Sequence, residues 1–136
     1  MESQNNSTNK IDALLINYEA FVRDLPELAA DWQLMDKEER SHHQVVLMEV
    51  WGKRRLLGQL YQTHQLLRTQ EARLAYLDQL LLEHASPMEK CFNFDLAHLL
   101  SIFRWGTPLA QSPQLVRIET AATSLNQLAQ ALVLVN

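Results

Sequence analysis

The chain has 136 residues, only three glycines and a net charge of −4 at pH 7. This length suits one domain, and the negative charge disfavours general nucleic-acid binding, which usually needs a basic surface. Leucine is abundant whereas Val, Ile and Thr are not, and this balance favours helices over strands. We therefore predict an all-α protein.

The N-terminal third contains a polar tail and two predicted helices. Residues 1–8 are rich in Asn and Ser, and we expect them to be disordered. Apolar residues then recur at three- and four-residue spacing, which predicts an amphipathic helix over residues 9–24. Pro26 should end this helix, because the residue before a proline is pushed out of the helical region. A short second helix is predicted over residues 26–33.

The longest predicted helix covers residues 36–67. Asp36 and Glu39 have the three-residue spacing of a capping box, and no proline interrupts the stretch that follows. Apolar side chains cover well over half of its circumference, so we expect it to be the centre of a bundle. His64 lies on this apolar face, where a histidine is more often a hydrogen-bonded core residue than a ligand.

Three further helices are predicted. Residues 69–84 carry a leucine-rich face, and the segment 86–89, Ser-Pro-Met-Glu, has the cap, the proline and the acid of a helix start. The helix that begins there should end near Trp105, although Asn93 is itself a good cap and can divide it. A last helix is predicted within residues 112–136.

No internal repeat and no long linker is present, so we expect residues 9–136 to form one bundle of about five or six helices. The single cysteine, Cys91, permits no internal disulfide, and no segment has the pattern of a signal sequence or a membrane span. We therefore expect a cytoplasmic protein. Cys91 lies on the apolar side of its helix, where it should be a small buried hydrophobe and not a nucleophile.

Two residue pairs have the spacing of metal ligands. Glu39-x-x-His42 and Asp95-x-x-His98 each place two ligands on one helix face, as in di-metal carboxylate bundles. The second pair has Asp in place of Glu, and capping also explains Glu39. The adjacent His42 and His43 should point to different sides of the helix and so cannot serve one site. Metal binding is therefore an alternative, and we expect no cofactor.

Asp95 is unusual because it falls among apolar residues if its helix is continuous. A buried carboxylate needs a partner, and Arg54 or Lys53 of the long helix would be suitable, so a buried Arg54–Asp95 ion pair is predicted. An equally good interpretation is that Asp95 caps a helix that restarts after Asn93.

A basic concentration could form a nucleic-acid surface, and it consists of Lys53, Arg54, Arg55, Arg68 and Arg73. Its three adjacent members fan out over about 200° of the helix, which is poor for one groove. Nucleic-acid binding is therefore the less favoured alternative.

Charge is spread unevenly along the chain, with −6 through Glu49 and +2 from Val50 onward, and this asymmetry could steer a partner. After Glu119 no side chain is charged, so the apolar end of the chain is a candidate surface for a partner or a second copy.

No nucleophile motif, glycine-rich phosphate loop or C-x-x-C pair is present, so we do not expect an enzyme. We expect a protein that binds another protein, as an adaptor, a regulator or a chaperone-like subunit. Large apolar residues near helix edges and chain ends often anchor interfaces, which selects Trp51, Trp105, Leu134 and Val135. Whether the protein also takes a small-molecule ligand is left open by the sequence.

Overall fold

The computed structural model describes residues 2–92 and 96–111, without the side chains of residues 2–7, 86, 96, 110 and 111. This part of the chain is helical and contains no strand, which confirms the prediction of an all-α bundle. Its elements are α1 (Glu2–Asp31), η1 (Trp32–Leu34), α2 (Lys37–Gln62), α3 (Arg68–Glu83), α4 (Ala85–Phe92), α5 (Leu96–Phe103) and η2 (Pro108–Gln111).

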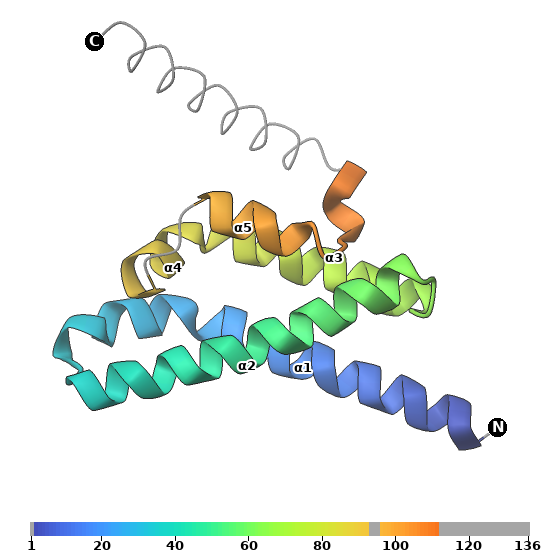
Figure 1. Cartoon of the computed structure of the whole chain (residues 1–136), viewed down its shortest axis with the longest axis horizontal. Coiled ribbons are helices and arrows are strands. Elements are labelled where there is room, and N and C mark those ends of the chain that lie inside the picture. Colours follow the sequence, from blue (N-terminus) through green and yellow to red (C-terminus); the bar gives the residue numbers. More distant parts are fainter. Residues whose placement is uncertain (1, 93–95, 112–136) are drawn as a thin grey trace, which may run out of the picture.

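Helix α1 is longer than predicted at both ends. It begins within the stretch 1–8 that we expected to be disordered, and it continues through Pro26. The prediction that Pro26 ends the first helix is therefore wrong, and the helix predicted over 26–33 is the end of α1 followed by η1. The proline lacks an N–H and crowds the preceding turn, and Figure 1 shows α1 changing direction in its second half. Buried Leu25 and Ala29 anchor the helix on both sides of the proline.

Helix α2 begins as the sequence predicts. The Asp36 side chain caps it, since its Oδ1 accepts a hydrogen bond from the Glu39 N–H at 2.8 Å. Glu38 and Glu39 lie in the first turn, where negative charge is favoured by the helix dipole. The predicted start of the helix is confirmed.

The end of α2 differs from the prediction, because the helix stops at Gln62 and not at residue 67. The N–H of His64 donates to the Tyr61 carbonyl and that of Gln65 to the Leu60 carbonyl at 2.9 Å, the bonds of a Schellman termination. His64 has a φ of 59° and is exposed. The prediction that it is a core histidine is therefore wrong.

The remaining helices follow the sequence closely. Helix α3 matches the predicted range 69–84 within one residue at each end, and α4 starts one residue before the predicted cap at Ser86. Asn93 and Asp95 lie outside the described residues, between α4 and α5. The whole predicted last helix, within 112–136, also lies outside them.

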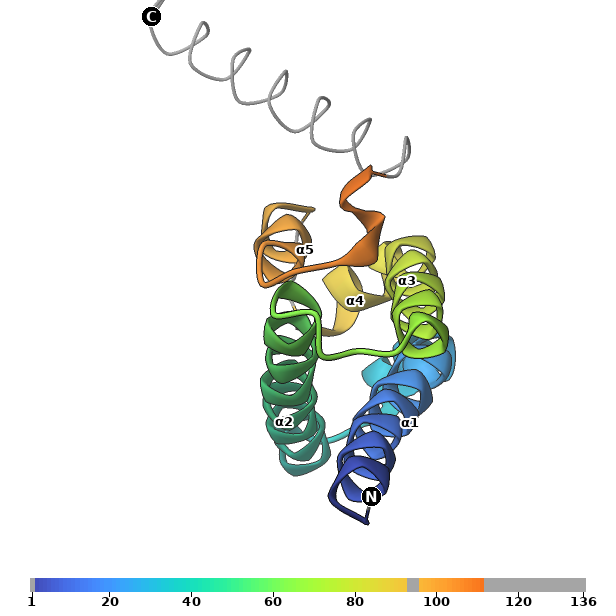
Figure 2. The ribbon, with the colours of Figure 1, turned by 90° about the vertical axis from the view of Figure 1, so that its right-hand side faces the viewer.

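Figure 2 views the bundle along its long axis, with α1, α2, α3 and α5 at four corners and α4 between them. Helix α1 packs against α2, α3 and α4, while α2 also contacts α5, so α1 shares the central position expected for α2 alone. The core contains side chains from all five helices, and its fully buried aliphatic members include Val22, Leu25, Leu57, Leu74, Leu77 and Leu81. No described helix combines the length and the hydropathy that crossing a bilayer requires.

Candidate functional site

A buried ion pair links α2 to α3. Arg54 donates from Nε to Oδ1 of Asp78 at 2.9 Å and from Nη2 to Oδ2 at 2.8 Å, so the two groups form a bidentate pair. Both side chains are fully buried. A buried charge without a partner is very unfavourable, and this two-bond geometry is what allows both groups to lie in the core.

Two hydroxyl groups complete the environment of the Asp78 carboxylate. Tyr18 of α1 donates to Oδ1 at 2.7 Å, and the Thr107 hydroxyl, from the segment after α5, donates to Oδ2. Arg54 Nη2 also donates to the Gly106 carbonyl at 2.8 Å. One carboxylate therefore joins α1, α2, α3 and the segment after α5. We call these five residues the Asp78 network.

Burial and charge shift the pKa values of two members of the network, Tyr18 and Arg54. Burial, together with the negative charge of Asp78, raises the pKa of Tyr18 well above its ordinary value. Burial disfavours the charge on Arg54, but the attraction of Asp78 and Tyr18 outweighs it and raises the pKa of Arg54. Neither shift moves a titration toward neutral pH, which acid–base catalysis requires. The network is best explained as structural.

Two glycines allow the segment after α5 to approach α2. A Cβ atom on Gly58 would lie 2.5 Å from the carbonyl oxygen of Trp105, closer than any real contact. Gly106 has a φ of 120°, a conformation that side chains rarely permit. This close approach brings the Gly106 carbonyl within reach of Arg54.

The sequence predicted that Arg54 forms a buried ion pair but selected Asp95 as its partner. Asp95 lies outside the described residues, and the partner that the structure gives Arg54 is Asp78. The sequence carried a signal for this residue. Asp78 is four residues after Leu74 and three before Leu81, so it lies on the apolar stripe of α3, as the same reasoning placed Asp95 on its own helix.

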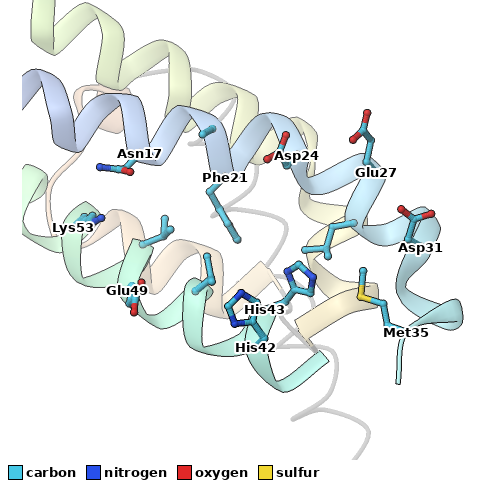
Figure 3. A pocket seen from close by; sticks show the side chains of 14 residues that line it. Asn17, Phe21, Asp24, Glu27, Asp31, Met35, His42, His43, Glu49 and Lys53 are labelled. Carbon is cyan, nitrogen blue, oxygen red and sulfur yellow. The ribbon is translucent and has the colours of Figure 1, made fainter. Parts of the chain in front are cut away.

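A groove of about 520 Å³ lies between the second half of α1 and the first half of α2. Its apolar lining consists of Ala20, Phe21, Leu28, Met35, Val46 and Val50. Figure 3 shows Phe21 pointing from α1 toward α2 across this space. We call it the α1–α2 groove.

Carboxylates dominate the charged lining of the groove. Asp24, Glu27 and Asp31 follow one another at three- and four-residue spacing on α1, and Glu49 comes from α2. All four are exposed, and none of them forms an ion pair with another described residue. Lys53 is the one lysine or arginine of the lining. The negative charge of the N-terminal part of the sequence is therefore partly concentrated here.

His42 and His43 both line the groove, with ring centroids 5.7 Å apart. Figure 3 shows both side chains extending from α2 toward α1. The two histidines, which the sequence places on different sides of the helix, thus line the same groove. The groove is wide enough to include two side chains that leave the helix about 100° apart.

The Asp78 network lies beside one end of the groove. Asn17 and Lys53 line that end, and they are the chain neighbours of Tyr18 and Arg54. The network therefore holds α1 and α2 at a fixed spacing there, while η1 and the turn after it connect the two helices at the other end.

In the part of the chain that the structure describes, the predicted metal ligands do not come together. Glu39 and His42 are exposed on α2 and His98 is exposed on α5, while Asp95 lies outside the described part. Within that part, no three His, Cys, Asp or Glu side chains are grouped as a metal ion would require.

The predicted basic cluster is dispersed. Arg54 is buried, Arg73 forms an ion pair with a glutamate of α1, and Lys53 lines the groove. Arg55 and Arg68 are exposed but belong to different helices. Arg54 is therefore inaccessible to a phosphate group.

The two tryptophans selected as partner contacts are packed in the fold and remain partly exposed. Trp51 packs edge-on against Phe21 with ring centroids 5.8 Å apart, and Trp105 lies under the guanidinium of Arg55 at 5.9 Å. Leu134 and Val135 lie outside the described residues. A role of these four in partner binding stays a prediction.

Cys91 is buried at 4% exposure and unpaired, as the sequence predicts. Burial raises the pKa of its thiol. A reactive cysteine needs the opposite shift, because the thiolate is the nucleophile.

Comparisons of this chain with protein-family models, with curated proteins and with solved structures find no match.

Proposed function

We propose that the protein is a non-catalytic interaction module of the cytoplasm, which binds another protein in the α1–α2 groove. The observation that carries this proposal is the lining of the groove, where Phe21, Leu28 and Val46 lie beside four exposed carboxylates. Apolar surface next to polar groups that have no internal partner is typical of binding sites.

The surroundings of the groove support binding without chemistry. Burial raises the pKa of Tyr18, the attraction of Asp78 raises the pKa of Arg54, and the Cys91 thiol is buried. A groove between two helices suits an adaptor, a regulator or a chaperone-like subunit. A single unpaired cysteine fits the reducing cytoplasm.

The proposal is tested by photo-crosslinking in cells of the native host. A photoreactive phenylalanine analogue replaces Ala20, which is exposed and lines the groove. The matched control places the same residue at Ala13, which is exposed on the same helix but does not line the groove. Both variants should fold, because neither position is in the core.

We expect a covalent product with another protein from the Ala20 position and none from Ala13. Irradiation that gives no product at Ala20, or the same product from both positions, would contradict binding in the groove.

A further inference from the structure

We propose that the α1–α2 groove receives a helical segment of its partner, about three to four turns long, with an apolar stripe flanked by lysine or arginine residues. This inference rests on the proposed function and adds the chemical class of the partner. The length, the apolar lining and the charge of the groove support this inference.

The dimensions of the groove fit a short helix. Its α1 side runs from Asn17 to Asp31 and its α2 side from His42 to Lys53. At 1.5 Å per residue these sides are about 21 Å and 16 Å long, which corresponds to three or four helical turns. A helix that lies along a groove between two others is the arrangement that many helix-in-groove complexes use.

The apolar lining gives the partner helix a surface for one face. Leu28, Met35 and Val46 are partly exposed, while Phe21 is 9% exposed. An entering helix with apolar residues at three- and four-residue spacing would cover these side chains along its length. A uniformly polar peptide would leave them in contact with water.

The charge of the rim selects a cationic segment. Glu27 lies three residues after Asp24 and four before Asp31, so the three carboxylates stack on one face of α1 without an intervening base. Like charges at these spacings repel one another. Lysine or arginine residues beside the apolar stripe of a partner would relieve this repulsion and would also increase the rate of association.

The test measures the affinity of synthetic peptides for the full chain by fluorescence anisotropy. The first peptide is a 14-residue amphipathic helix with a leucine stripe and lysines on the remaining positions. The second keeps the stripe and replaces lysine by glutamate, and the third keeps the lysines and scrambles the stripe. We expect the first to bind at least about tenfold more tightly than either of the others.

Two pairs of protein variants locate the binding. The first variant combines Asp24→Asn, Glu27→Gln and Asp31→Asn. Its affinity for the first peptide should be about tenfold lower at low salt. The control removes the same charge elsewhere, through Glu38→Gln, Glu83→Gln and Glu89→Gln at exposed positions outside the groove, and should change the affinity much less.

The second pair tests the space itself. Ala20→Arg should abolish binding, because it places a long cationic side chain in the groove, whereas Ala13→Arg on the same helix should not. Circular dichroism and the unfolding midpoint show whether each variant is folded.

The outcomes separate the two proposals. Equal binding of the three peptides, or equal effects of a groove variant and its control, overturns the cationic helix. A crosslink from Ala20 to another protein would then leave the proposed function standing. A crosslinked product that consists of two copies of this chain overturns the partner proposed here, since the occupant is then the chain itself.

Discussion

The carboxylate of Asp78 accepts most of the hydrogen bonds in the buried network. Tyr18, Arg54 and Thr107 all donate to it, and they come from three different parts of the chain. The Nη1 atom of Arg54 is also buried, with no hydrogen-bond partner among the described residues. In the described part of the chain, the guanidinium therefore hydrogen-bonds to Asp78 and to the Gly106 carbonyl only, and it also lies 5.9 Å from the centroid of the Tyr18 ring.

Loss of the carboxylate should be far more damaging than loss of the whole pair. Asp78→Ala leaves the Arg54 charge buried without its partner, and we expect it to lower the free energy of unfolding by about 3–5 kcal/mol. A variant with Asp78→Leu, Arg54→Met and Tyr18→Phe removes the charges together and should be more stable than Asp78→Ala. Urea denaturation measures both. A cost below about 1 kcal/mol for Asp78→Ala would mean that the pair is not buried in solution.

Tyr18 should make the protein sensitive to alkali. Its pKa is raised in the folded state, so the unfolded chain loses this proton first and stability falls as the pH rises above about 10. Tyr18→Phe removes that contribution. The test measures the urea midpoint of unfolding between pH 9 and 11, about one unit on either side of the ordinary tyrosine pKa. Over this range the midpoint of the variant should fall less steeply than that of the parent protein. Parallel declines would contradict the assignment.

At the scale of the helices, α2 carries two glycines with opposite requirements. Gly58 faces the backbone of Trp105, whereas nothing lies within 4 Å of a Cβ placed on Gly52. Gly58→Ala should therefore destabilise the protein by about 1–3 kcal/mol through a clash that only backbone movement can relieve. Gly52→Ala should stabilise it by about 0.5–1 kcal/mol, since alanine is the better helix former. Thermal unfolding of the two variants gives the comparison, and a same-sign change would refute it.

The end of α2 offers a second local test. His64 occupies the left-handed position of the helix termination, where glycine carries no side-chain penalty. We expect His64→Gly to raise the unfolding temperature by a few degrees and His64→Val to lower it. An increase for valine would show that the termination adopts another conformation in solution.

The sequence predicts the helices better than their junctions. The Asp36 cap and the leucine spacing of α3 are local signals, and both are confirmed. Pro26 misled the prediction because tertiary burial of Leu25 and Ala29 outweighs a local preference to stop. His64 belongs to a termination that depends on backbone bonds and not on its side chain.

At the scale of the whole molecule, the fold determines where the acidic residues gather on the surface, and the sequence alone does not show this. An acidic N-terminal part was evident, but its concentration beside one groove depends on how α1 crosses α2 (Figure 1). The Asp78 network was half predicted, because Arg54 could be recognised as needing a partner while the choice between candidate carboxylates depended on packing. The spacing of apolar residues predicts which face of each helix is buried. Which faces then pack against one another depends on the packing of the whole core.

The acidic rim should also carry a stability cost in the free protein. Asp24→Asn with Glu27→Gln and Asp31→Asn changes the net charge of −4 by three units and removes two repulsive spacings on α1. We expect the variant to be more stable than the parent by about 0.5 kcal/mol in low salt, and the gain should vanish at about 1 M salt, where surface charges are screened. Denaturation at the two salt concentrations checks this, and a loss of stability in low salt would contradict it.

The position of Asp78 has a consequence for the order in which the chain can fold. Its donors come from residues separated by most of the described sequence, from Tyr18 to Thr107. A partly assembled bundle in which α2 and α3 have met but the segment after α5 has not arrived would bury charge with incomplete hydrogen bonding, which is unfavourable. Such intermediates should be sparsely populated. The segment after α5 that carries Thr107 should therefore become protected from hydrogen exchange together with α1, α2 and α3, as one cooperative unit.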